Sequence, residues 1–232
     1  MKHVYFLAAS SAGSGLTSVA LGVFRALDRR GIRVGFAKPI GQEILGQEEQ
    51  DASISLIRCT TGFEPADPLP LEEAETYVRE NNVDDLLELV VERVSSQADE
   101  VDVMVVEGLL PTKDQTFQTQ INAAMAQALG ADVILVNSMS SVEPAALSDD
   151  LETAAAIYGG WTHPRVFGCI LNKVRGTSTH EELLLLAEKL ERECEIFQGD
   201  SFHLLGCVPW NFDLPSHRVS DVARHLNAHA KC

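Results

Sequence analysis

The sequence lacks any apolar run long enough to cross a membrane. Its longest runs, such as residues 4–9 and 101–106, have the length of strands, whereas a membrane helix needs roughly 18 to 20 apolar residues. The N-terminus also lacks the charged start, the longer apolar core and the cleavage site of a signal peptide, because it enters an apolar run at once. We therefore expect no membrane span, a domain that begins at residue 1 and a cytoplasmic protein.

Cysteines are few and are not spaced as metal ligands. The chain has 5 of them, at positions 59, 169, 194, 207 and 232, with no C-x-x-C pair. An odd number of widely separated cysteines does not predict a disulfide framework, a zinc site or a redox centre. We interpret them as reduced thiols.

Basic residues are also scarce, and the formal net charge is −16. Between residues 43 and 102 only Arg58, Arg79 and Arg93 are basic. An acidic chain repels the phosphodiester backbone, so nucleic acid is an unexpected partner. The acidic stretch is typical of a solvated, solubilising surface, which we favour over a dedicated site for a basic partner.

What the sequence does contain is an alternation of short apolar runs and helical patterns. The predicted strands are residues 4–9, 33–37, 101–107, 132–136, 166–171 and 203–207. The predicted helices are residues 16–30, 52–59, 71–80, 83–97, 117–129, 144–158, 181–194 and 217–230.

This order predicts an α/β fold, with a doubly wound, mostly parallel sheet and helices on both faces. Short strands without polar alternation are typical of strands buried on both faces. The sequence has no internal repeat, low-complexity tract or linker. We therefore expect one domain over residues 1–232.

The first predicted strand and helix are joined by a degenerate phosphate-binding loop. Against the pattern G-x-x-x-x-G-K-[ST], Gly15 and Thr17 match, but Leu16 stands in the lysine position and Ser10 in that of the first glycine. Main-chain N–H groups at such a turn favour an anion even without the lysine. The candidate phosphate-binding residues are Ser10, Ser11, Ala12, Gly13, Ser14, Gly15, Thr17 and Ser18. The alternative is a glycine- and serine-rich turn that only begins the helix.

Several segments resemble the N-terminal domain of long-form bacterial phosphate acetyltransferases, also called phosphotransacetylases. They are residues 14–30, 36–40, 105–112, 170–173, 206–210 and 221–228, in the same order as in that family. The resemblance implies that acetyl transfer between coenzyme A and phosphate resides in a C-terminal domain that is absent here. It also implies an allosteric and structural role for this chain, with a nucleotide or central metabolite as effector, the C-terminal domains as partners, and a homo-oligomer.

That domain is in turn similar to dethiobiotin synthetase and the cobyrinic acid amide synthetases, which are P-loop ligases that use ATP. The similarity implies that Thr17, Asp51 and Glu107 hold Mg²⁺, an ion that prefers hard oxygen ligands. It implies that Lys38, in Lys38-Pro39-Ile40, faces the reacting phosphate and that Asn172 reads the adenine edge. ATP or another nucleotide with Mg²⁺ is therefore the expected ligand, bound weakly, and no cofactor is expected to be essential.

Each of these residues also has an ordinary structural interpretation. Asp51 suits a helix cap, Glu107 the polar end of a strand, Lys38 an exposed loop, and Asn172 a turn. Two functions stay open for the chain: a regulatory domain that is not catalytic alone, and a stand-alone ligase of the dethiobiotin synthetase type. Leu16 favours the first, because a ligase needs a lysine in that position. A third possibility is a domain that acts only in oligomerisation.

Overall fold

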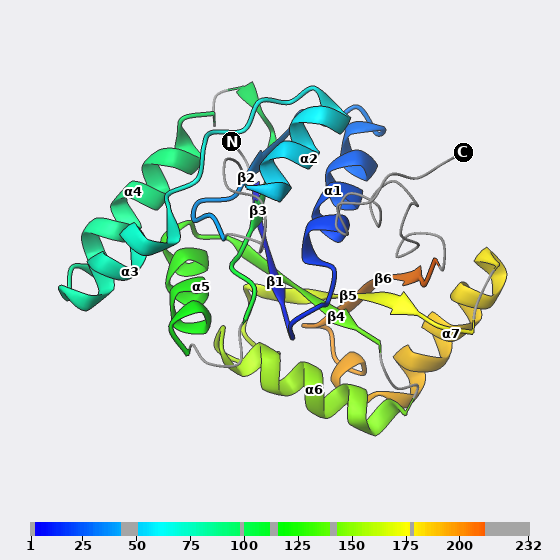
Figure 1. Ribbon diagram of the computed structural model, residues 1–232. Coiled ribbons are helices and arrows are strands. Elements are labelled where there is room, and N and C mark those ends of the chain that lie inside the picture. Colours follow the sequence, from blue (N-terminus) through cyan, green and yellow to red (C-terminus); the bar gives the residue numbers. More distant parts are fainter. Residues whose placement is uncertain are drawn as a thin grey trace, which may run out of the picture.

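The computed structural model describes residues 3–42, 51–97, 100–111, 116–139, 143–176 and 179–211, which build a parallel sheet covered by helices (Figure 1). The strands are β1 (His3–Ala9), β2 (Val34–Ala37), β3 (Val103–Glu107), β4 (Asp132–Ser138), β5 (Val166–Val174) and β6 (His203–Pro209). Their order in the 6-stranded sheet is β2-β3-β1-β4-β5-β6, and every pair is parallel. The predicted α/β class with a doubly wound sheet is confirmed.

The central strands are buried on both faces, as their largely apolar sequences predict. In β1, Phe6 and Ala8 belong to one apolar cluster, whereas Leu7 between them belongs to a second cluster. Successive side chains of a strand point to opposite faces. The two clusters are therefore the two covered faces of the sheet.

Helices cover both faces. The helices are α1 (Leu16–Asp28), α2 (Ala52–Thr61), α3 (Leu71–Arg79), α4 (Val83–Ser95), α5 (Thr116–Ala128), α6 (Pro144–Ala156) and α7 (His180–Glu193), with a short 3-10 helix, η2 (Glu195–Phe197). Buried residues of α1 and α2 pack in the cluster of Leu7, while those of α3 to α7 pack in the cluster of Phe6. Figure 1 shows α1 and α2 side by side on their face.

The predicted elements recur with shifted ends. The largest extension is β5, which continues beyond residue 171 to Val174, because it pairs with Ser138 on one side and Pro209 on the other. The predicted helix at residues 217–230 lies outside the described residues. Among the helices that the structure describes, none is long and apolar enough to cross a membrane.

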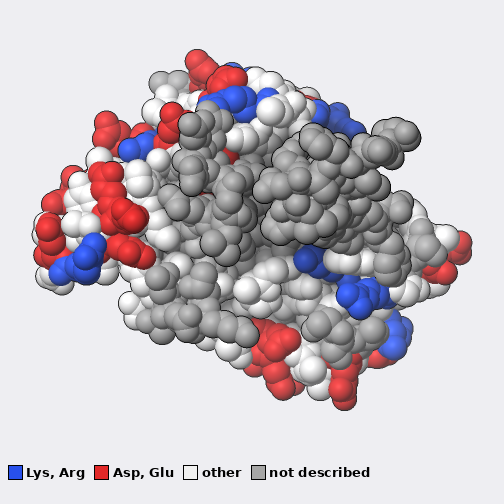
Figure 2. All heavy atoms as spheres, viewed as in Figure 1, with Lys and Arg blue, Asp and Glu red and all other residues white. Residues whose placement is uncertain are grey.

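Parallel strands bring several predicted site residues to one edge of the sheet. The loop from Ser10 follows β1, Lys38 follows β2, Glu107 ends β3, and Asn172 lies near the end of β5. Ligands of open parallel sheets bind outside this carboxyl edge. Away from it, Figure 2 shows acidic side chains gathered over α3 and α4 at the left of the view.

Candidate phosphate and cation site

The loop between β1 and α1 has an exposed crest and a buried base. Ser11, Ala12 and Gly13 are exposed, whereas Ser14 is fully buried. Gly13 and Gly15 have φ angles of 77° and 80°, in the left-handed region that glycine adopts without strain. These two glycines turn the chain sharply from the strand into the helix.

The first turn of α1 is open to an anion. Gly15 is its N-cap and offers no side-chain cap. The first N–H groups of a helix have no partner within the helix, so they are available to an anion or to water. Ser14 Oγ, buried in the same loop, has no hydrogen-bond partner among the described residues. The loop therefore combines open main-chain donors with an unpaired hydroxyl.

Two hydrogen bonds anchor the start of this loop to the sheet. The main-chain N and the Oγ of Ser10 both donate to Val136 O on β4, at 3.0 and 3.2 Å. Ser18, also predicted to contact phosphate, lies exposed in the first turn of α1. The loop is thus fixed at its base and exposed at its crest.

Leu16, in the position of the P-loop lysine, belongs to the core. Its side chain is 1% exposed and packs in the apolar cluster that α1 and α2 share with the sheet. This position contributes packing and no charge to the loop.

A buried polar cluster lies next to the loop, between α1, α2, β2 and β3. Lys38 Nζ is 2.9 Å from Asp51 Oδ2 and 3.3 Å from Glu107 Oε1. Thr17 Oγ1 donates to Glu107 Oε1 at 3.0 Å. The structure therefore brings together Thr17, Lys38, Asp51 and Glu107, which the sequence placed far apart.

Ser53 also belongs to this cluster, although no sequence motif indicated it. Its Oγ donates to Glu107 Oε1 at 2.7 Å, accepts from Lys38 Nζ at 3.1 Å and lies 3.0 Å from Thr17 Oγ1. The only signal in the sequence was its position 2 residues after Asp51, in the first turn of α2.

Asp51 performs two tasks at once. It is the N-cap of α2, and its Oδ1 accepts from the main-chain N of Ser53 and Ile54. Its other oxygen, Oδ2, faces Lys38 and also accepts from the main-chain N of Gln42 at 3.2 Å. Asp51 is therefore both the N-cap of α2 and an ionic partner of Lys38.

The environment of Glu107 is strongly desolvating. Burial raises the pKa of this carboxyl, and the charge of Lys38 and the hydrogen bonds from Ser53 and Thr17 oppose that shift. Its second oxygen, Oε2, is buried and has no hydrogen-bond partner among the described residues. Carboxylate and hydroxyl oxygens suit Mg²⁺, and the unpaired Oε2 is a donor atom for such an ion, so these residues fit the metal.

Asn172 and Lys173 reach the loop from the end of β5. Asn172 Nδ2 donates to Ser14 O at 2.8 Å, and Lys173 Nζ donates to Gly13 O at 2.6 Å. Asn172 Oδ1 accepts from the main-chain N of Lys173 at 2.9 Å. Both side chains therefore hold the loop, and the reading of adenine by Asn172 stays a prediction.

The aromatic ring of Trp210 lies next to the Lys173 side chain. Lys173 Nζ lies 5.6 Å and the Arg175 guanidinium 5.4 Å from the ring centroid of Trp210. Such distances are typical of cation–π contacts. Trp210 follows β6, so the ends of two neighbouring strands both contribute to the surroundings of the loop.

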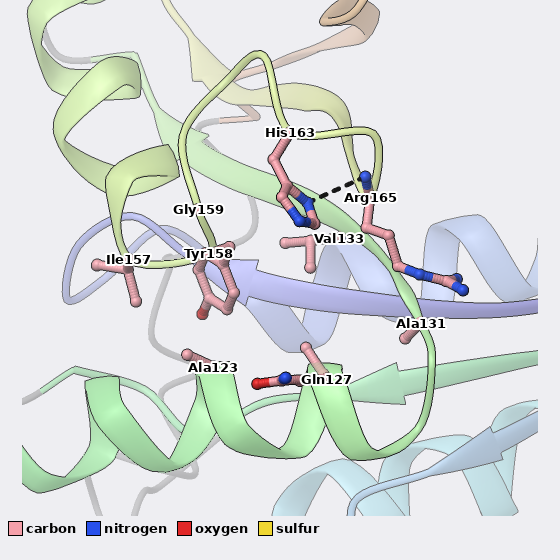
Figure 3. Close-up of a pocket in the computed structure, with 10 residues that line it drawn as sticks. Ala123, Gln127, Ala131, Val133, Ile157, Tyr158, Gly159, His163 and Arg165 are labelled. Atoms are coloured by element: carbon pink, nitrogen blue, oxygen red, sulfur yellow. Dashed lines mark hydrogen bonds between the residues drawn. The ribbon is translucent and has the colours of Figure 1, made fainter.

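A separate cavity lies at the opposite edge of the sheet (Figure 3). Its volume is about 460 Å³, and its lining includes Val133 near the start of β4, Arg165 just before β5, and Tyr158 after α6. His163 Nδ1 in its wall accepts a hydrogen bond from the main-chain N of Arg165 at 3.2 Å. No residue of the loop or of the polar cluster lines it. The cavity is therefore distinct from the candidate site.

A family model described as an AAA domain, AAA_26, matches residues 3–218. The phosphate acetyltransferase of Nitrosomonas europaea is 38% identical over 226 residues, which are 97% of this chain and 32% of that protein. The phosphate acetyltransferase of Pseudomonas aeruginosa is 36% identical over 230 residues, covering 97% and 32%. The chain thus spans about one third of the length of these relatives.

Solved structures with the same fold include two proteins described in complex with GDP. Signal recognition particle 54 kDa protein from Aeropyrum pernix has a TM-score of 0.51 at 16% identity, covering 84% of this chain and 40% of that one. The signal recognition particle receptor FtsY from Elizabethkingia anophelis has a TM-score of 0.52 at 10% identity, covering 76% and 51%. At such identities the likeness shows the shared fold alone.

Proposed function

Since this chain belongs to the AAA_26 family of P-loop domains, we propose that it is a regulatory and structural domain of a phosphate acetyltransferase. In this proposal the loop after β1 binds a nucleotide or another phosphorylated metabolite together with Mg²⁺. The chain by itself does not transfer acetyl groups. That activity, from acetyl-CoA and phosphate to acetyl phosphate and coenzyme A, is assigned to the part of the longer relatives that this chain does not span.

The observation that carries the proposal is the contact between the loop and the buried carboxylate. Thr17, in the first turn of α1, donates to Glu107 Oε1 at 3.0 Å. A phosphate at the open N–H groups of that turn would therefore lie beside a group of oxygen ligands for Mg²⁺. Mg²⁺ in proteins usually bridges carboxylates and substrate phosphates in this way.

Leu16 supports weak or regulatory binding over efficient phosphoryl transfer. A P-loop lysine would offset the charge that develops on the β- and γ-phosphates. Here the corresponding side chain packs in the core. Lys173 Nζ, which donates to Gly13 O, places a positive charge at the outer side of the loop instead.

The proposed partners follow from the length of the relatives. This chain spans about one third of the phosphate acetyltransferases that it matches. The domain would pack against the remaining sequence of such a protein. We propose that its ligand state is transmitted to those domains within a cytoplasmic homo-oligomer. The effector is proposed as a nucleotide or a central metabolite.

A stand-alone ATP-dependent ligase of the dethiobiotin synthetase or cobyrinic acid amide synthetase type is the second candidate. The buried ion pairs of Lys38 with Asp51 and Glu107 favour it, because they retain the ionic groups that the resemblance implies for those ligases. Leu16 counts against it.

Calorimetric titration of the purified chain with ATP, with and without Mg²⁺, tests the proposal. We expect Mg²⁺-dependent binding without phosphate release in a parallel assay. Thr17→Val, which keeps the shape of the side chain and removes its hydroxyl, is expected to weaken Mg²⁺-dependent binding. Phosphate release would favour the ligase instead, and absence of binding to ATP would contradict the nucleotide site.

A further inference from the structure

Oxygen atoms enclose the ammonium of Lys38. Its Nζ lies 2.9 Å from Asp51 Oδ2, 3.3 Å from Glu107 Oε1 and 3.1 Å from Ser53 Oγ. The side chains of Lys38, Asp51 and Glu107 are 4%, 2% and 0% exposed. The lysine therefore ends in a pocket of oxygen ligands that is shielded from water.

Thr17 completes this group of oxygens, which we name the oxygen cage: Thr17 Oγ1, Ser53 Oγ, Asp51 Oδ2 and the Glu107 carboxylate. Thr17 Oγ1 is 3.0 Å from both Ser53 Oγ and Glu107 Oε1. Glu107 Oε2 is buried and lacks a hydrogen-bond partner within the described part of the chain. The cage thus has one carboxylate oxygen that Lys38 does not satisfy.

The composition of the cage is that of a divalent cation site. It combines two carboxylates with two hydroxyls, and hard oxygen ligands of this kind bind Mg²⁺ at about 2.0 to 2.1 Å. One ammonium balances only one of two ionised carboxylates, whereas a divalent cation balances both. A buried charge left without a partner is costly, so the cage favours a bound cation over no occupant.

We propose that Lys38 and a divalent cation are alternative occupants of the oxygen cage. The ammonium already contacts three of its members at 2.9 to 3.3 Å. A metal ion bonded to the same atoms would overlap the ammonium and repel its charge. Lys38 therefore leaves Asp51 and Glu107 when the metal enters.

A regulatory consequence follows, and it rests on the proposed function. A phosphate at the first turn of α1 offers Lys38 a new anionic partner, because Thr17 of that turn belongs to the cage. The phosphate thereby releases the carboxylates to the metal, and the metal releases Lys38 to the phosphate. Each ligand then strengthens binding of the other by the same factor, as thermodynamic linkage requires.

Titration of Lys38→Met with Mn²⁺ alone, in the absence of nucleotide, tests the exclusive occupancy. Carboxylate-rich oxygen sites accept Mn²⁺ as well as Mg²⁺, and free Mn²⁺ is measured by electron paramagnetic resonance. We expect Lys38→Met to bind Mn²⁺ about tenfold or more tightly than the wild type, because the competing charge is gone. Lys38→Met combined with Glu107→Gln is the control, and it should return to the weak affinity of the wild type.

Folding of these variants is followed by circular dichroism and thermal unfolding. If Lys38→Met is unfolded without metal, Mn²⁺ should restore its structure. Lys38→Gln, which keeps a hydrogen-bond donor, is then titrated with Mn²⁺ in the same way. Equal Mn²⁺ affinity in the wild type and a folded Lys38 variant would overturn the proposal. The proposal would also be overturned if Mn²⁺ neither bound nor refolded Lys38→Met and Lys38→Gln.

A separate ATP titration distinguishes this inference from the proposed function. If Lys38→Met binds Mn²⁺ more tightly than the wild type does, while the wild type binds no ATP, the exclusive occupancy is supported and the nucleotide role fails. If the wild type binds ATP while a folded Lys38→Met variant binds no Mn²⁺, the nucleotide role stands and the exclusive occupancy fails.

Discussion

Asn172 Nδ2 donates a hydrogen bond to Ser14 O at 2.8 Å and so joins the end of β5 to the loop after β1, across a sequence separation of 158. Lys173 adds a second bond to the neighbouring Gly13 O. Both bonds hold the loop from outside, at main-chain carbonyls. The first-turn N–H groups of α1 therefore stay available.

Gly15→Ala should disrupt this contact. A Cβ at residue 15 would clash with Asn172 Nδ2, and the φ of Gly15 is 80°, a value that residues with a side chain rarely adopt. We expect the free energy of unfolding in urea to fall by about 2 to 3 kcal/mol, since the left-handed backbone costs about 1 to 2 kcal/mol and the displaced amide adds to it. ATP affinity should fall with it.

Gly13→Ala is the matched control. Gly13 has a similar φ of 77°, but a Cβ there would meet nothing within 4 Å. Its cost should be limited to the backbone strain of about 1 to 2 kcal/mol. Equal losses in the two variants would show that the contact with Asn172 is unimportant.

Leu16→Lys tests whether the loop keeps P-loop geometry. Because Leu16 is 1% exposed in the core, the substitution should lower the free energy of unfolding by about 2 to 5 kcal/mol, as other losses of a buried leucine do. If the loop keeps P-loop geometry, the folded fraction should bind ATP more tightly, because a lysine in that position of a P-loop reaches the β- and γ-phosphates. Urea unfolding and calorimetry measure the two effects.

Leu16→Met serves as the control, with an expected stability loss below about 1.5 kcal/mol and no gain in ATP affinity. Unchanged affinity of folded Leu16→Lys for ATP would contradict the proposed geometry of the loop.

Trp210 should report on the state of the loop. Lys173 contacts both Gly13 O and the Trp210 ring, so a ligand that moves the loop changes the charge near the indole. The chain has 2 tryptophans. In a Trp161→Phe background, ATP with Mg²⁺ should therefore shift the emission of Trp210.

Lys173→Met should abolish that shift, because the charged link between loop and ring is removed. A shift of the same size in Lys173→Met would place the origin of the signal elsewhere. Trp161→Phe and its Lys173→Met derivative are each also measured without ATP, and that spectrum is the baseline for the same protein.

The thiol of Cys207 should react only at high pH. Burial, assisted by the charge of Glu191, raises its pKa to about 11. The reactive species is the thiolate, so the rate of modification should rise about tenfold per pH unit between pH 8 and 10. A Cys59→Ser, Cys232→Ser variant removes two other thiols from the measurement. The reaction with dithionitrobenzoate is followed by the absorbance of the thionitrobenzoate that it releases.

Cys207→Ser in the same background identifies the signal. Buried Cys169, whose pKa burial also raises, should stay unreactive in the folded protein. A rate that levels off near pH 9 would indicate a thiol of ordinary acidity and contradict the expected environment.

Much of the fold could be predicted because its signals are local. Each strand has an apolar run of its own, and α1 has a regular apolar period that ends near Gly31. The strand ends were less predictable, since β5 extends to Val174 only through pairing with β4 and β6. Neighbouring strands decided that boundary.

The sequence by itself determined the α/β class and the candidate phosphate loop, because apolar periodicity, the glycines and the pattern around Thr17 are local features. The other residues of the candidate site were implied only by the resemblance to P-loop ligases. Only the tertiary structure decided what those residues do together. It buried Leu16 in the core, enclosed Lys38 between Asp51 and Glu107, and added Ser53 to the group. The physical reason is that a parallel sheet gathers the ends of distant strands at one edge, and no local pattern records which side chains meet there.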